Sequence, residues 1–274
     1  MAGQKTKPRV KRREVEGGDG WTVITHGLSN LKVSENKKEK GNAKGGSKKV
    51  AGQMPNRTVQ DLTAEKLLAE FEVLWGRWGD VAVARQMREL LGKRKRKLDK
   101  AVCIGIGSFA RDWEQRWRSL WQLVLFVEGV RLLGKKKDVE RFAQDPAFTT
   151  LDIEFLKLLD ITTVQTGIEE HISTESFVFS PFVDWFILLP TFLKEKDPEV
   201  YVGNEILDDY TIYAQTAEKQ AKLDECNHIG ARFLTGREKQ KLADFEGHAH
   251  AFNGMVVYLQ EKGEEEDAEE READ

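Results

Sequence analysis

Short apolar runs that alternate with helix-like segments are the feature that most limits how this chain can fold. Each run is followed within three residues by a glycine or a proline, and the runs are Ala101–Ile106, Val139–Ala143, Ile161–Gln165, Phe177–Phe179 and Val200–Val202. Neighbouring parallel strands need a crossover segment between them, usually a helix. The alternation therefore predicts βαβ units and a mostly parallel sheet.

The segments between these runs carry apolar residues at helical spacing. The longest extends from Trp113 to Val130, with an apolar stripe that suits a helix lying on a sheet. We also expect a helix over Thr235–His250 and a strand over Met255–Leu259, which together would complete the sheet at one edge. The predicted fold class is α/β, a Rossmann-like three-layer sandwich with a mostly parallel sheet, flanked by disordered termini.

A shorter helix is expected after the second strand. Thr149 or Thr150 can cap it by accepting a backbone N–H. Its expected buried face consists of Ile153, Leu156 and Leu159, with Phe155 at the edge.

A helical lead-in precedes the sheet. Its first helix is expected to begin at Thr63 and to be broken by Gly76 and Gly79, and Val81–Leu91 is expected to form a second amphipathic helix. The five consecutive cations Lys93–Lys97 are interpreted as an exposed loop, with a phosphate or nucleic-acid contact as the less favoured alternative.

The net charge of the whole chain hides oppositely charged segments at its two ends. The formal net charge is −3, but residues 1–57 hold 14 Lys/Arg and 5 Asp/Glu, and residues 261–274 hold 2 Lys/Arg and 9 Asp/Glu. The first segment is also poor in periodic apolar residues and cannot bury enough surface to offset its ordering entropy. We therefore predict a disordered basic arm (1–57), the helical lead-in (58–97), an α/β domain (98–260) and an acidic disordered tail (261–274).

Several classes of protein are excluded by what the chain lacks. Its longest apolar runs, such as Leu123–Val127, have five residues, against about 20 for a helix that crosses a bilayer. The basic N-terminus is not followed by an apolar segment of the kind that secretion requires. Cys103 and Cys226 lack the spacing of a disulfide framework or a zinc site. We expect a protein of the cytosol or the nucleus, without membrane insertion.

Two features of the arm suggest partners. The segment Gly20–Gly27 holds Trp21 and β-branched residues, which suits either a transient extended segment or a short strand that docks on a partner or on its own domain. The surrounding lysines could bind nucleic acid, but solvated charge is the favoured interpretation. Protein partners are therefore expected ahead of nucleic acid, and the oligomeric state is left open.

Ligands of open parallel sheets bind beyond the carboxyl ends of the strands, where the strand order reverses. The loops at these ends carry the candidate ligand-binding residues Gly105, Gly107, Ser108, Asp145, Pro181 and Asn204.

The segment Gly105-Ile106-Gly107 has part of the pattern of a phosphate-binding loop, in which glycines let backbone N–H groups approach an anion. A third glycine is missing, and Asp145 lies 38 residues after Gly107 instead of about 20. Glycines needed for tight turning and strand packing explain the pattern equally well, and Asp145 could merely cap the next helix. The cofactor stays open between a nucleotide-like and a methyl-donor molecule.

No catalytic or metal-ligating group stands out. His248 and His250 are two residues apart, so on a helix they would point in different directions. A serine elbow, a P-loop and a pair of carboxylates are also missing. The tryptophans Trp113, Trp117 and Trp121 follow core spacing and are expected to pack the helix instead of stacking bases.

Over about residues 98–260 the chain resembles the Sensitivity-to-Red-light-Reduced family (SRR-like domain). The resemblance is carried by segments in a fixed order along the chain: Val102–Phe109, Trp121–Leu125, Gln144–Phe148, Phe177–Pro181, Val202–Ile206 and Ala251–Asn253. It implies a Rossmann-like domain with a regulatory role, linked in the family at large to circadian input, haem biosynthesis and the cytoskeleton. Where the family usually has Pro-His-Cys after the fourth strand, this chain has Pro181-Phe182-Val183.

Two functions follow as hypotheses. The first is a regulatory protein that acts through partner binding, with the family's links to circadian regulation and haem biosynthesis. The second is a ligand-binding protein or enzyme that uses a nucleotide-like or methyl-donor cofactor at the six candidate residues. The missing histidine and thiol favour either a binding or regulatory role or a paralogue that has lost an activity.

Overall fold

The computed structural model describes residues 13–16, 22–25, 59, 61–92, 98–111, 113–134 and 139–261. The chain divides into two units, Met1–Asn56 and Arg57–Asp274, and each is described by itself. In the first unit, β1 (Arg13–Glu16) and β2 (Thr22–Thr25) pair antiparallel, so the segment Gly20–Gly27 contains a short strand.

Three of the sequence predictions fall mostly outside the described residues. These are the remainder of the disordered arm, the exposed loop over Lys93–Lys97 and the acidic tail beyond Glu261.

A seven-stranded sheet forms the centre of the second unit. Its strands are β3 (Lys100–Ile104), β4 (Glu140–Gln144), β5 (Thr162–Thr163), β6 (Ser176–Ser180), β7 (Val200–Asn204), β8 (Arg237–Lys241) and β9 (Met255–Gln260). The spatial order is β5-β4-β3-β6-β7-β9-β8, with β5, β4, β3, β6 and β7 parallel and β9 antiparallel to both of its neighbours. The order reverses between β3 and β6, which is the Rossmann-like arrangement that the alternating sequence predicts.

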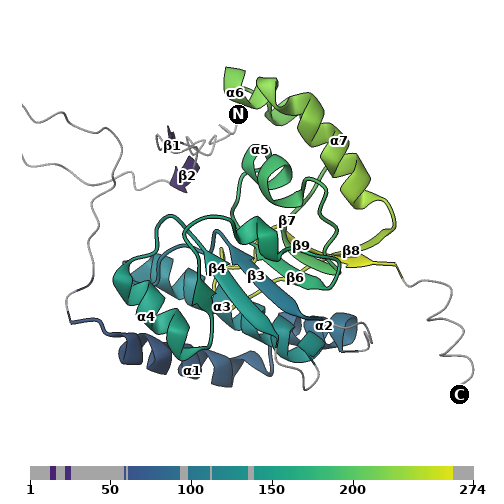
Figure 1. The fold of residues 1–274 in the computed structure, drawn as a ribbon. Coiled ribbons are helices and arrows are strands. Elements are labelled where there is room, and N and C mark those ends of the chain that lie inside the picture. The colour runs from purple at the N-terminus through teal and green to yellow at the C-terminus, as the bar shows by residue number, and fades with distance from the viewer. Residues whose placement is uncertain are drawn as a thin grey trace, which may run out of the picture. The chain divides into compact units, whose positions relative to one another are not determined.

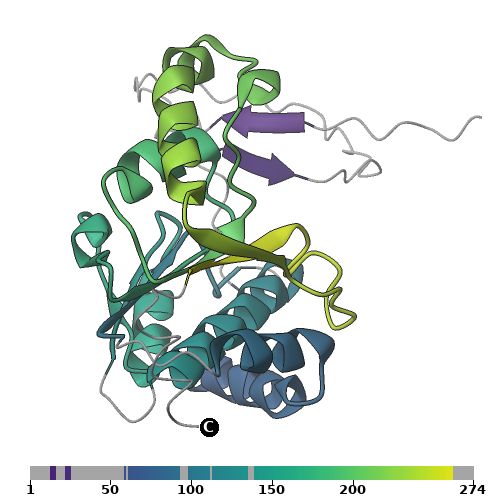
Figure 2. The same ribbon diagram turned by 90° about the vertical axis from the view of Figure 1, so that its right-hand side faces the viewer.

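Helices cover both faces of this sheet (Figure 1 and Figure 2). One face carries α1 (Ala64–Trp78), α2 (Ala82–Leu91), α3 (Trp113–Gly134) and α4 (Thr150–Leu158). The other carries α5 (Trp185–Ile187), the π-helix η2 (Leu188–Leu193) and α7 (Leu223–Leu234), and α6 (Ala217–Ala221) contacts α7. Right-handed crossovers explain the division, because the chain moves one way from β3 to β5 and the other way from β6 to β7.

Short 3₁₀ turns, η1 (Ile168–His171) and η3 (Thr211–Tyr213), lie in two of the connections. Among the described residues, no helix is long and apolar enough to cross a membrane.

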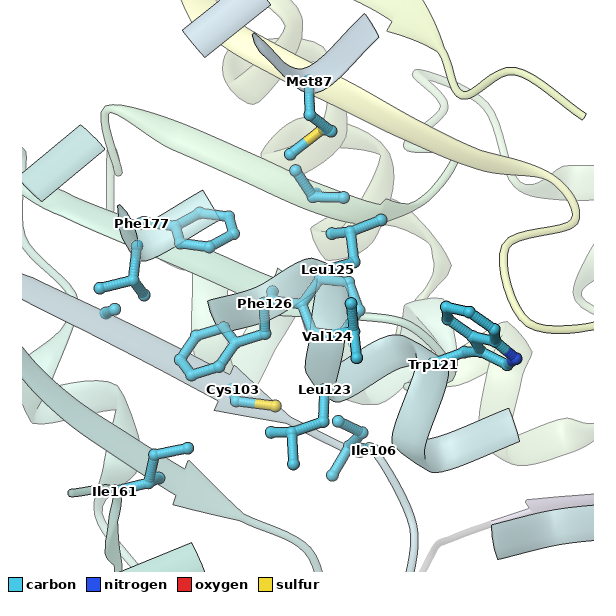
Figure 3. Packing of buried hydrophobic residues seen from close by; sticks show 14 of the residues in the cluster. Met87, Cys103, Ile106, Trp121, Leu123, Val124, Leu125, Phe126, Ile161 and Phe177 are labelled. Atoms are coloured by element: carbon cyan, nitrogen blue, oxygen red, sulfur yellow. The ribbon is translucent and has the colours of Figure 1, made fainter. Parts of the chain in front are cut away.

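The middle of the helix α3 is buried on all sides. Seven consecutive residues, Leu120–Phe126, are buried, which a helix with only one face on a sheet would not show. Figure 3 shows Met87 of α2 on one side of α3 and Cys103 of β3 on the other. The predicted apolar stripe is therefore only part of the buried surface of α3, because α1 and α2 cover its outer side.

A glycine sets how closely α3 approaches the sheet. A Cβ atom at Gly129 would lie 2.6 Å from Cε1 of Phe177 in β6. One turn earlier in α3, the ring of Phe126 stacks on Phe177 with 5.7 Å between ring centroids. The missing side chain thus lets α3 lie directly against β6.

The connection between β8 and β9 packs against α3 and the lead-in helices. Phe245 and Phe252 form an aromatic cluster with Trp78 and Trp121. Trp121 is 3% exposed, which agrees with a packing role for this residue. Gln122 Nε2 donates to the carbonyl of Ala251 at 2.8 Å, so two of the segments that carry the family resemblance contact each other.

The structure contradicts the predicted C-terminal helix. The helix ends at Leu234, because Gly236 adopts a left-handed φ of 69°. The charged residues that follow form the edge strand β8, and pairing with β9 overrides their helix propensity. The strand β9 forms as expected, but it lies between β7 and β8 instead of at the edge.

Three smaller predictions are also wrong. Gly76 lies inside α1, where a glycine lowers stability without ending the helix. In α4, Ile153 is 41% exposed and Phe155 is fully buried, because α1 packs on the side that Phe155 faces. The third strand is limited to Thr162–Thr163 instead of extending over Ile161–Gln165.

The contact of α3 with β6 generates a stability prediction. Gly129→Ala should destabilise the protein by about 1–3 kcal/mol, because the new methyl group overlaps the ring of Phe177. Gly76→Ala is the matched control, since a Cβ at this exposed helical position has no neighbour within 4 Å. It should stabilise by about 0.5–1 kcal/mol. Urea unfolding measures both, and effects of the same sign would contradict the packing argument.

Candidate functional site

The carboxyl ends of four parallel strands meet at one edge of the sheet. In spatial order these strands are β4, β3, β6 and β7, with the reversal of strand order between β3 and β6. All six candidate residues lie at this edge: Gly105, Gly107 and Ser108 after β3, Asp145 after β4, Pro181 after β6, and Asn204 at the end of β7.

Two glycines with left-handed backbone form the loop after β3. Gly105 has φ 74° and donates its N–H to the carbonyl of Gln144 at 3.0 Å, which extends the β3–β4 pairing. Gly107 has φ 82°, a conformation that other residues rarely adopt. The loop is held to α3 by Ser119, whose hydroxyl donates to the carbonyl of Ile106 at 2.8 Å.

Asp145 connects the loops that follow β3 and β4. Its Oδ2 accepts the N–H of Gly107 at 2.7 Å, and its Oδ1 accepts the N–H of Ala147 at 2.7 Å. The side chain is half-buried. Burial raises the pKa of Asp145, although the two N–H groups and the positive charge of Arg111 oppose that shift. Asp145 thus connects the glycine loop to the loop after β4 through hydrogen bonds, and its carboxylate is also partly exposed to solvent.

A second carboxylate, Asp152, lies beneath this loop and is fully buried. Its oxygens accept hydrogen bonds from the N–H groups of Phe109 at 2.7 Å, Ala110 at 3.0 Å and Thr149 at 2.7 Å. The hydroxyls of Ser108 and Thr149 donate to it as well, at 2.7 and 2.9 Å. Ser108 therefore points inward and is 2% exposed, so its hydroxyl holds the loop instead of facing the solvent side of the edge.

Residue-by-residue reasoning missed Asp152, although a local signal was present. Thr149 and Asp152 are three residues apart at the start of α4 and form a capping box, in which each side chain accepts the backbone N–H of the other. The box predicts the helix start. The contacts with the loop after β3 come from tertiary structure and have no sequence signal.

The loop after β6 contributes both buried and exposed residues to the edge. Pro181 and Val183 are buried, whereas Phe182 is 39% exposed. Asn204 donates from Nδ2 to the carbonyl of Val183 at 3.4 Å and so ties the end of β7 to this loop. The guanidinium carbon of Arg118 in α3 lies 4.8 Å from the ring centroid of Phe182. Neither Arg118 nor Phe182 was a predicted site residue.

Thiols and metal ligands do not gather at the edge in the part of the chain that the structure describes. Cys103 is buried in β3, and burial together with the negative charge of Asp145 raises the pKa of its thiol well above the ordinary value. Burial raises the pKa of Cys226 to about 11. No group of three His, Cys, Asp or Glu side chains lies close enough among the described residues to hold a metal ion.

Comparison with known proteins shows that the part of the chain that forms the sheet matches a known family. The family model of the SRR1 domain matches residues 83–259, which includes all six candidate residues. A search of curated proteins finds no match.

The chain is also similar to solved structures. One is cofactor-bound Rv0187 from MTB, with 11% identity, a TM-score of 0.37, and coverage of 72% of this chain and 91% of that one. Another is phospholethanolamine N-methyltransferase 2 from Haemonchus contortus, with 10% identity, a TM-score of 0.31, and coverage of 65% and 52%. A third is a SAM dependent methyltransferase from Agrobacterium tumefaciens, with 12% identity, a TM-score of 0.31, and coverage of 65% and 61%. TM-scores this low do not support an inference about activity.

Asp152 generates the first prediction of the site. Asp152→Asn should destabilise the protein by about 3 kcal/mol or more, because an amide cannot accept all five hydrogen bonds and leaves buried donors unpaired. The control is Glu154→Gln, an exposed position of the same helix, which should change stability by less than about 0.5 kcal/mol. Urea unfolding checks this, and a loss no greater than the control's would contradict the role of Asp152.

Asp145 generates a prediction about pH. Its folded pKa lies above the ordinary 3.8, so its stabilising contribution is complete below 3.8 and is lost as pH rises through the folded value. The wild type should therefore lose stability relative to Asp145→Asn as the pH is raised from 3.5 through the folded pKa of Asp145. Urea unfolding of both proteins at each pH measures the difference between their free energies of unfolding, and the titration of the other groups cancels in that difference. A difference that changes in the opposite direction would contradict the raised pKa.

Proposed function

The chain belongs to the SRR1 domain family, and from this premise we propose that it is a regulatory protein whose α/β domain binds a nucleotide-like or methyl-donor ligand. The ligand lies at the carboxyl edge of the sheet, against Gly105, Gly107 and Asp145. Protein partners respond to the occupied domain, in keeping with the links of the family to circadian regulation and haem biosynthesis. The proposal concerns binding and assigns no reaction.

The observation that carries the proposal is that the Asp145 carboxylate uses only part of its capacity to accept hydrogen bonds. An ionised carboxylate has about four lone-pair sites, and Asp145 uses two of them for the N–H groups of Gly107 and Ala147. The two that remain belong to a half-buried side chain at the reversal of the strand order. A ribose diol has two neighbouring O–H donors that match them.

The glycine loop supplies the second part of the site. Without side chains at Gly105 and Gly107, the backbone can come close to a ligand, and both glycines have the left-handed φ that such a turn needs. The N-terminus of the 22-residue helix α3 follows, and its dipole favours an anionic group. Arg111 is close enough to Asp145 to affect its pKa and adds positive charge on the same side.

The departure from the family pattern supports binding over reaction. The histidine and the thiol that the family usually carries after this strand are replaced here by Phe182 and Val183. Any proton transfer or thiol chemistry that depends on those two side chains is therefore unavailable at this position. An aromatic ring and an aliphatic side chain can contact a ligand but cannot exchange protons with it.

A thermal-shift screen of the full-length protein tests the proposal with adenosine monophosphate, S-adenosylmethionine and haem. A ligand at 100 times its dissociation constant should stabilise the protein by about 2.7 kcal/mol. For a folded unit of this size, that amount raises the melting temperature by roughly 5–10 °C. No shift with any probe at millimolar concentration would overturn the proposal, and a shift with haem alone would overturn its diol argument.

Two variants locate the binding. Asp145→Ala should abolish the ligand-induced shift, because the acceptor of the diol is removed. Glu140→Ala is the control, since Glu140 is an exposed carboxylate at the opposite end of the same strand and should leave the shift unchanged. Each shift is taken relative to the variant's own unliganded melting temperature, so that a general loss of stability is not counted as a loss of binding.

A further inference from the structure

Arg118 and Phe182 form a cation–π pair at the candidate site, which we call the platform. The guanidinium carbon of Arg118 lies 4.8 Å from the ring centroid of Phe182, within the range of a cation–π contact. Phe182 is 39% exposed, although ten other phenylalanines of this unit are buried. An aromatic ring held in a fixed pose yet open to solvent is the form of a stacking surface.

The scaffold, not the loop alone, sets the position of the platform. Gly129 of α3 lies against Phe177 of β6. Eleven residues separate Arg118 from Gly129, which is about 16 Å along a helix. Phe182 is five residues after Phe177 and two residues beyond the end of β6 at Ser180, so it lies up to about 16 Å from Phe177 in the strand direction. Because the helix and the strand run in opposite directions, their close contact at one end places Arg118 beside Phe182 at the other.

The distance between the platform and Asp145 allows one ligand to contact both. The strands β4, β3 and β6 are consecutive neighbours, so the ends of β4 and β6 are two strand spacings apart, or about 10 Å. Asp145 shortens this gap, because its carboxylate reaches across to the loop after β3, where it accepts the N–H of Gly107. A flat ring attached to a diol on Asp145 can therefore extend over β3 to the platform.

We propose that the platform is the base-stacking subsite of a nucleoside-type ligand, whose heteroaromatic ring stacks on this cation–π pair while its ribose diol bonds to Asp145. The inference rests on the proposed function and adds the class of ligand. Stacking recognises the presence of a flat ring more than its identity.

Titration calorimetry of the full-length protein tests the subsite with adenosine monophosphate and with ribose 5-phosphate, which lacks the base. The wild type should bind adenosine monophosphate about tenfold or more tightly than ribose 5-phosphate. Phe182→Leu should lower the affinity for adenosine monophosphate about tenfold and leave that for ribose 5-phosphate unchanged. Arg118→Lys should act in the same direction, because an ammonium group lacks the plane of a guanidinium.

The matched control is Tyr213→Leu, which removes another aromatic ring, 48% exposed, from the turn η3. It should change neither affinity. Unliganded melting temperatures show whether each variant is folded.

The outcomes separate the two proposals. If the wild type binds neither compound, the subsite is wrong, and the proposed function fails with it only if S-adenosylmethionine also produces no thermal shift. If the wild type binds both compounds equally, or if Phe182→Leu lowers both affinities equally, the subsite is wrong and the proposed diol contact stands.

Discussion

The buried carboxylate of Asp152 is the contact on which the candidate site depends. A charge without access to water is tolerated only when hydrogen bonds compensate for the lost hydration, and five donors surround this one. Some come from the loop after β3 and the others from the start of α4, so the same group sets the path of the loop and the first turn of the helix. The position of Gly107 above it, and hence its bond to Asp145, follows from that arrangement.

The two carboxylates near this loop differ in how many of their acceptor sites the protein itself uses. Asp152 is saturated with donors from its own chain and has no capacity for a ligand. Asp145 is half-buried, uses half of its acceptor sites, and lies at the reversal of strand order. The contact of α3 with β6 at Gly129 then brings Arg118 and Phe182 to the same edge. An acceptor with unused sites and a cation–π pair thereby lie along one line of strand ends.

The errors of sequence reasoning share a physical cause. The residues of β8 favour a helix by propensity, but pairing with β9 outweighs a preference of a few tenths of a kcal/mol per residue. Phe155 and Ile153 exchange their expected roles because α1 covers one side of α4, which no local pattern reveals. Ser108 stays a predicted ligand-site residue, and its hydroxyl donates to Asp152, a partner 44 residues away that no local pattern indicates. Each case turns on a contact between segments that are distant in the chain.

The sequence by itself determined the alternation of strands and helices, the parallel sheet and the common edge of the six candidate residues, because the periodicity of apolar residues and the handedness of crossovers are local or nearly universal rules. It also carried the family resemblance, since the motifs can be read in order without coordinates. Only the tertiary structure decided that β9 lies inside the sheet, that Asp152 holds the loop, and that Arg118 covers Phe182. These features depend on distances between residues far apart in the chain, and such distances are set by packing.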